Sequence, residues 1–190
     1  MTFLKLFVVV LFMTSAAFAD TSKATFAGGC FWCMEEPFDK LDGVISTTSG
    51  FTGGGSQDTT YGEVSSGKTA HLESVEILYD PGKISYEELL EVFWKNIDPT
   101  NPEGQFCDRG AQYRSAIFYH DETQKQLAEQ SKQRIESILK KPIVTPILKA
   151  TEFHLAEDYH QDFYKKNALR YKQYKIRCGR ERRLHELWGE

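Results

Sequence analysis

The residues of this chain that could do chemistry are two cysteines, Cys30 and Cys33, which enclose two aromatic residues, Phe31 and Trp32. Two glycines and a short apolar stretch precede them, and a stretch of helical character follows. The start of a helix offers unpaired amide hydrogens and a partial positive charge, both of which favour a thiolate over a thiol. We therefore expect Cys30 to be a nucleophile with a lowered pKa. Cys33, one helical turn further on, is expected within disulfide reach of it.

The same pair could instead be structural, as a disulfide or as part of a zinc site. A disulfide between Cys30 and Cys33 would close so short a loop that it would remove little entropy from the unfolded chain. Structural zinc needs four ligands, and in the sequence Cys107 and Cys178 stand alone, with no histidines spaced as a set. We therefore predict no metal site.

Phe31 and Trp32 could be core residues, which is the usual role of an aromatic side chain. Their position beside the nucleophile favours a second role, because a substrate must approach the sulfur there. An aromatic wall would hold an apolar group such as a methyl, and sulfur packs well against rings. We expect the two rings to line a substrate pocket.

Residues 1–19 have the pattern of a secretory signal peptide, with Lys5 near the start, an apolar run, and Ala17 and Ala19 at the cleavage position. The apolar run is shorter than the roughly 20 residues that span a bilayer, which disfavours an uncleaved anchor. We expect export to the periplasm or the medium, and a mature protein of residues 20–190 that forms one domain outside the membrane. The net charge of −4 argues against nucleic acid as a partner.

The elements that must position these residues follow one another without the strict alternation of a parallel doubly wound sheet. Hydrophobic patterns predict strands at 23–29, 43–51, 71–80, 112–120 and 143–153, and helices at 33–41, 85–97 and 121–141. The predicted fold class is therefore α+β, a two-layer sandwich with helices packed on a mixed or antiparallel sheet. The long loops at 52–68 and 98–111 are expected to form the rim of the active site.

Local signals refine this outline. Ser85 and Glu88 form a capping-box pattern at the start of the second helix. Pro146 stands inside the last strand, which predicts an edge position because proline cannot donate to a strand ladder. Pro37 is expected early in the first helix, where a proline is tolerated.

Six motifs occur along the mature chain in a fixed order, and any one of them alone would be modest evidence. They are "GGCFWC" at 28–33, "GFTGG" at 50–54, "YGEVSSG" at 61–67, "HLESVEILYDP" at 71–81, "DRGAQYRSAI" at 108–117 and "AEDYHQDFY" at 156–164. Together they cover nearly all of the mature chain. In these motifs the sequence resembles the A-type peptide-methionine sulfoxide reductases.

The resemblance implies an α+β sandwich, no metal or organic cofactor, and activity on the S epimer of methionine sulfoxide, free or in oxidised proteins. It implies that Cys30 is the catalytic cysteine and that Glu73 is the catalytic acid. The other implied site residues are Phe31 and Trp32 around the substrate methyl, Tyr61 and Tyr113 at the sulfoxide oxygen, and Asp108 as an organising carboxylate.

The chemistry of these residue types agrees with the resemblance. A sulfoxide sulfur is electrophilic only when its oxygen is protonated or strongly hydrogen-bonded, so thiolate attack needs a proton donor. Glu73 shares a strand face with Val75 and Ile77, and burial there should raise its pKa and keep it protonated. Tyr61 and Tyr113 would then clamp the oxygen. The alternatives are a surface position for Glu73 and simple packing for the tyrosines.

The sequence leaves open which cysteine removes the resulting sulfenic acid. Sulfenic acids condense readily with a neighbouring thiol, and proximity favours Cys33. Cys178 could instead resolve Cys30 or pass the disulfide outward, and Cys107 could pair with either. One common form of the family has a glycine after the tryptophan and its recycling cysteines near the C-terminus, and this chain departs from it. A thioredoxin-like protein is the expected reductant, and a monomer is expected.

Two other classes of protein compete with this interpretation. A general thiol–disulfide oxidoreductase also carries Cys-x-x-Cys at a helix start, but its thioredoxin-like fold does not match the order of elements after residue 41. A metal carrier would need a second pair of ligands, which the sequence does not offer.

Overall fold

The computed structural model describes residues 20–55 and 59–189. The predicted signal peptide, residues 1–19, lies outside the described residues. Within the described part of the chain, every helix is too short or too polar to cross a bilayer.

A six-stranded mixed sheet forms the centre of the fold, in the order β7-β6-β1-β3-β2-β8. Its strands are β1 (Ser22–Gly28), β2 (Val44–Thr52), β3 (Leu72–Tyr79), β6 (Ser115–Tyr119), β7 (Ile147–Lys149) and β8 (His154–Leu155). All neighbouring strands pair antiparallel except β6 and β7, which are parallel. Strand β7 begins directly after Pro146 and lies at the sheet edge, as predicted from the proline.

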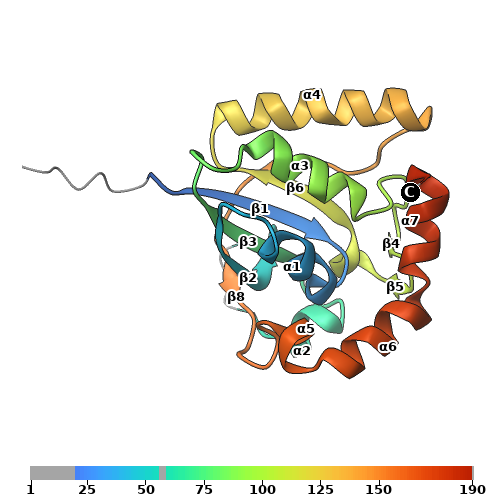
Figure 1. The fold of residues 1–190 in the computed structure, drawn as a ribbon. Helices are drawn as coiled ribbons and strands as arrows, with labels where there is room; N and C mark the ends of the chain where they lie inside the picture. Colours follow the sequence, from blue (N-terminus) through green and yellow to red (C-terminus); the bar gives the residue numbers. More distant parts are fainter. Residues whose placement is uncertain (1–19, 56–58, 190) are drawn as a thin grey trace, which may run out of the picture.

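Helices cover the sheet, so the predicted α+β class is confirmed (Figure 1). The three main ones are α1 (Phe31–Asp39), α3 (Tyr86–Lys95) and α4 (Glu122–Leu139). Phe26 of β1 stacks against Phe38 of α1 and Phe93 of α3, with ring centroids 5.4 and 4.9 Å apart. Helices α1 and α3 therefore pack on the same face of the sheet, and the apolar core lies between them and β1.

Local signals set the ends of these elements. Ser85 and Glu88 form the predicted capping box of α3, with each side chain bonded to the other residue's backbone amide. Helix α1 begins at Phe31, two residues earlier than predicted. Pro37 consequently lies in the second half of α1 and not at its start, so the prediction of an early proline was wrong.

The two predicted loops contain short elements that the sequence did not indicate. Residues 52–68 include α2 (Tyr61–Ser65), and Thr60 and Glu63 form a second capping box at its start. Residues 98–111 form a hairpin of β4 (Gly104–Gln105) and β5 (Asp108–Arg109), and the 3-10 helix η1 (Ala111–Tyr113) follows it. Tyr61 and Tyr113 thus stand on short helical turns, and Tyr113 precedes the strand in which it was expected.

Three further helices end the described chain, where the sequence is too polar to show a clear apolar stripe. They are α5 (Phe163–Lys166), α6 (Ala168–Cys178) and α7 (Arg180–Trp188). Figure 1 shows α6 and α7 running past one end of the sheet, beside β4 and β5. A disulfide between Cys107 and Cys178 joins this segment to the hairpin.

Candidate active site

Cys30 lies where β1 passes into α1. Gly29 makes the turn with φ +84°, a conformation that favours glycine. A side chain on Gly28 would collide with Met34, since an added Cβ would lie 2.5 Å from its sulfur. Cys30 is the N-cap residue of α1, and its carbonyl accepts a bond from the Cys33 amide at 3.0 Å. Both cysteines are free thiols and are buried.

A hydrogen bond between the Cys30 and Cys33 thiols makes their pKa values differ. Burial raises the pKa of the Cys30 thiol, and the neighbouring Cys33, Glu73 and Asp108 raise it further. The bond from Cys30 lowers the pKa of Cys33 to about 7, with help from the positive charge of Arg180. The expected lowering of the Cys30 pKa was therefore wrong for the resting site, because burial outweighs the helix N-terminus.

Glu73 lies beside this thiol pair. In the antiparallel pairing of β1 with β3, Phe26 faces Val75, and continuing that register places Gly28 beside Glu73. The Phe31 amide donates to the Glu73 carboxyl at 3.2 Å. The side chain is 2% exposed, and burial raises its pKa to about 8 despite that bond. Glu73 is therefore a carboxylic acid that keeps its proton at neutral pH, as its strand face predicted.

Tyr61 and Tyr113 approach the same place from α2 and η1. The two hydroxyls lie near enough to affect each other's pKa. Burial raises the pKa of both phenols, and Glu73 and Cys30 contribute through their charges. Both tyrosines are therefore proton-bearing donors, grouped around the carboxyl and the thiol.

The two predicted pocket rings have different surroundings. Phe31 is buried, and its ring centroid lies 5.8 Å from that of Phe51. Trp32 is partly exposed and lies flat on Phe163, with 3.7 Å between ring centroids. Its indole nitrogen donates to Nδ1 of His160 at 3.0 Å. The Trp32 ring is thus fixed on one face and at one edge.

His160 is a site residue whose role the sequence did not reveal. It stands in the motif "AEDYHQDFY", which the sequence analysis used only for the family resemblance. Besides its bond to Trp32, its ring contacts Phe31 and Tyr61, at centroid distances of 5.0 and 4.3 Å. Glu157 of the same motif accepts a bond from the Tyr61 amide at 3.2 Å. The motif therefore supports both the aromatic wall and the tyrosine pair.

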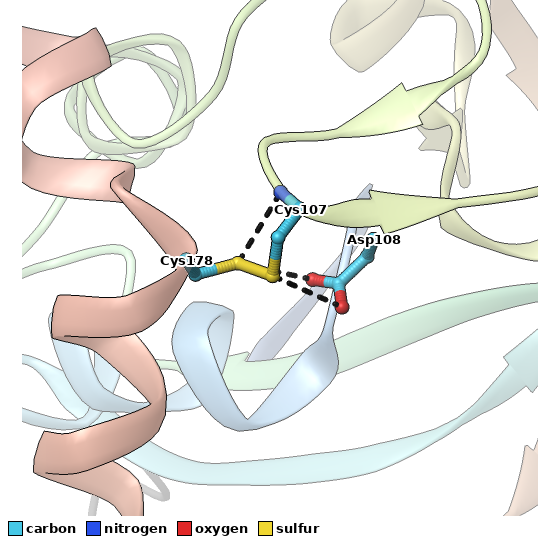
Figure 2. Close-up of side chains that lie close together, drawn as sticks. All are labelled: Cys107, Asp108 and Cys178. Carbon is cyan, nitrogen blue, oxygen red and sulfur yellow. Dashed lines mark hydrogen bonds between the residues drawn. A yellow bond between two sulfur atoms is a disulfide. The ribbon is translucent and has the colours of Figure 1, made fainter.

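Asp108 lies on β5, next to the disulfide between Cys107 and Cys178 (Figure 2). Burial raises the pKa of this carboxyl, while a hydrogen bond from the Tyr174 hydroxyl acts in the opposite direction. Cys107, Asp108 and Cys178 have their ligand atoms within 4.8 Å of one another, which would suit a metal ion. The two sulfurs are bonded to each other, however, and a disulfide offers no thiolate to a metal.

Comparison with known proteins identifies the family. The family model described as "Peptide methionine sulfoxide reductase" matches residues 22–190. The chain belongs to the peptide methionine sulfoxide reductase family. It is 55% identical over 168 residues to "Peptide methionine sulfoxide reductase MsrA" of Bacillus subtilis, which covers 87% of this chain and 95% of that protein. Family membership makes the chain an oxidoreductase.

Solved structures agree with this assignment. Mxr1 from Saccharomyces cerevisiae in reduced form matches with a TM-score of 0.75 and 30% identity, over 80% of this chain and 88% of that one. Mxr1 in complex with Trx2 matches with a TM-score of 0.55 and 21% identity, over 78% of this chain and 91% of that one. The second likeness shows the shared fold.

The bond between Trp32 and His160 makes a prediction for NMR. Trp32 can only donate, so His160 Nδ1 must accept, and protonation of His160 would break the bond. Because burial lowers the pKa of His160, the indole N–H signal of Trp32 should stay at its hydrogen-bonded position until the pH falls below the usual histidine range. The variant His160→Phe should show the shifted signal at every pH.

Trp94 provides the internal control, since its indole nitrogen donates to the hydroxyl of Ser131 at 3.0 Å and has no histidine partner there. Its signal should stay constant in the same titration. A Trp32 signal that is the same in His160→Phe and in the parent protein would show that His160 does not hold the ring.

Proposed function

We propose that this protein reduces methionine-S-sulfoxide, free or within oxidised proteins, to methionine. The observation that carries the proposal is a buried, proton-bearing carboxyl, Glu73, at the same helix start as the buried thiol of Cys30. A thiol attacking a sulfoxide needs such an acid, because the oxygen must be protonated as the sulfur is attacked. The assignment of the chain to its family supports the same reaction.

The first step uses the shared proton of the cysteine pair. Cys33, with its pKa of about 7, accepts the proton of Cys30 as the Cys30 sulfur attacks the sulfoxide sulfur. Glu73 gives its proton to the sulfoxide oxygen, so that the substrate sulfur carries a hydroxyl group and a bond to Cys30. The hydroxyl group then passes to the Cys30 sulfur, while both the sulfur–oxygen bond and the new sulfur–sulfur bond of the substrate break. The products are the thioether of methionine, a sulfenic acid on Cys30, a thiol on Cys33 and a carboxylate on Glu73. Tyr61 and Tyr113 stabilise the oxygen as its charge grows.

The second step restores the thiols. The Cys33 thiol attacks the sulfenic acid of Cys30, which forms a disulfide and releases water. Cys107 and Cys178 are bonded to each other, so neither presents a thiol in this structure, and this favours Cys33 as the resolving residue. A dithiol protein of the thioredoxin class then reduces the new disulfide. The solved complex of the related fold Mxr1 with Trx2 supports a partner of that class.

Export remains part of the proposal, with repair of oxidised exported proteins as its purpose. The pattern of residues 1–19 supports it, and so does the disulfide between Cys107 and Cys178, since disulfides persist in oxidising compartments. N-terminal sequencing of the protein isolated from its host tests this. A first residue near Asp20 is expected, and an intact leader on a cytosolic protein would contradict export.

The variant Glu73→Gln tests the acid. In the parent protein, the single-turnover rate should fall as the pH rises through about 8, because ionised Glu73 has no proton to give. In the variant, this decline should be absent and the rate should be lower by ~100-fold or more, as expected for loss of a general acid. The measurement is methionine formed per enzyme over time, from pH 6 to about 10.

Glu76→Gln is the matched control, because Glu76 lies on the same strand but pairs with Lys23 at the surface. It should leave the rate and its pH dependence unchanged. A loss of only a few-fold in Glu73→Gln would reduce Glu73 to a packing or orienting residue.

The variant Cys33→Ser tests the resolving step. It should still form methionine from one equivalent of sulfoxide, but more slowly, because the thiolate that accepts the Cys30 proton is gone. It should then stop with a sulfenic acid on Cys30, which dimedone traps and mass spectrometry detects. Turnover with a thioredoxin donor should be lost. Cys30→Ser should form no methionine even in a single turnover, and normal turnover of Cys33→Ser would assign resolution to another cysteine.

A further inference from the structure

The C-terminal arm, defined here as α6 and α7 (residues 168–188), reaches the active site through Tyr174. The ring of this residue lies edge-on against Trp32, with centroids 6.0 Å apart and an interplanar angle of 80°. Its hydroxyl donates to Asp108. One side chain of the arm thus touches both the pocket wall and the carboxylate of the site.

The arm is fastened to the hairpin that carries Asp108. Cys178, the last residue of α6, is bonded to Cys107, the residue that precedes Asp108 in the chain (Figure 2). One turn of α6 separates Cys178 from Tyr174. The disulfide therefore ties together the two segments whose side chains meet in the bond between Tyr174 and Asp108.

Non-covalent contacts hold the neighbouring helix α7 in place. Arg180 is buried, donates to the carbonyl of Asn96 at 2.5 Å and lies 4.4 Å from the ring centroid of Phe106. Arg183 pairs with Asp98 at 2.8 Å. These contacts act on α7. At the end of α6 that bears Tyr174, the disulfide acts together with the bonds of Tyr171 and Lys175 to Glu36 of α1.

We propose that the disulfide between Cys107 and Cys178 is a latch, and that it holds Tyr174 against Asp108 and Trp32 as a positioning residue for sulfoxide reduction. The inference rests on the proposed function. It gives the second cysteine pair a task outside the electron path, namely to fix the arm that completes the site.

The latch affects catalysis through charge. The hydrogen bond from Tyr174 favours the ionised form of Asp108, and the charge of Asp108 raises the pKa of both Glu73 and Cys30. Without the Tyr174 hydroxyl, Asp108 takes up a proton more readily and the pKa of Glu73 falls. The titratable groups that face Glu73 are Cys30, Cys33, Tyr61, Asp108 and Tyr113.

Tyr174→Phe separates positioning from simple packing, since it keeps the ring on Trp32 and removes only the hydroxyl. The high-pH decline of the single-turnover rate should move to lower pH. Tyr164→Phe is the matched control, because Tyr164 also donates to an aspartate, Asp39, outside the site. Its pH profile should not move, and an unmoved profile in Tyr174→Phe would overturn the positioning role.

The double variant Cys107→Ala/Cys178→Ala tests the latch. The pH profile should shift as in Tyr174→Phe, and the KM for methionine sulfoxide should rise several-fold because Trp32 loses its edge contact. Amide hydrogen exchange in α6 should accelerate while the sheet stays protected. Hydrogen exchange needs no turnover, so it tests the latch even if the proposed reaction fails.

A count of products tests the competing hypothesis that Cys107 and Cys178 relay electrons to Cys30 and Cys33. Fully reduced parent protein and the double variant should each form one methionine per molecule, from Cys30 and Cys33 alone. Two methionines from the parent and one from the variant, with unchanged α6 exchange and pH profile, would make the outer pair a relay and overturn the latch.

Discussion

The site depends on the burial of an acid and a thiol at one point, the start of α1. The bond from the Phe31 amide to Glu73 fixes the carboxyl there, and the register of β1 on β3 brings the two segments together. Burial makes ionisation of the Glu73 carboxyl and of the Cys30 thiol costly, so both groups stay protonated in the resting site. The remaining features, including the tyrosine pair and the aromatic wall, surround this point.

The same burial explains why the two cysteines differ. A thiolate at Cys30 would be cut off from solvent and repelled by the negative charges of Glu73 and Asp108, which raises the pKa of Cys30. A thiolate at Cys33 is stabilised by the hydrogen bond from Cys30 and by the positive charge of Arg180, which lowers the pKa of Cys33. The hydrogen bond between the two thiols therefore makes Cys33 the more acidic of the pair. Cys30 then becomes a nucleophile only as its proton passes to Cys33.

The sequence predicted the parts of the fold that rest on local or periodic signals. The alternation through Val75 and Ile77 placed Glu73 in the core, and Ser85 and Glu88 marked the start of α3. The short helix α2 was missed because five residues carry no periodicity. Helices α6 and α7 were missed because these segments show no clear apolar stripe.

Contacts between distant segments could not be predicted from one sequence. Four cysteines allow three pairings, and only the fold selects Cys107 with Cys178. The bond of Trp32 to His160 and that of Tyr174 to Asp108 join residues 128 and 66 positions apart. The pKa of Cys30 was predicted in the wrong direction because the helix start is a local feature, whereas burial is a property of the whole fold.

The most direct test of the account is the pKa of the Glu73 carboxyl itself. Carbon-13 NMR of glutamate-labelled protein, with Glu73→Gln used to assign the signal, follows this one group through a pH titration. The account predicts a midpoint near pH 8. A midpoint near ~4.3, the value of an unperturbed glutamate, would leave the site without its acid and contradict the account.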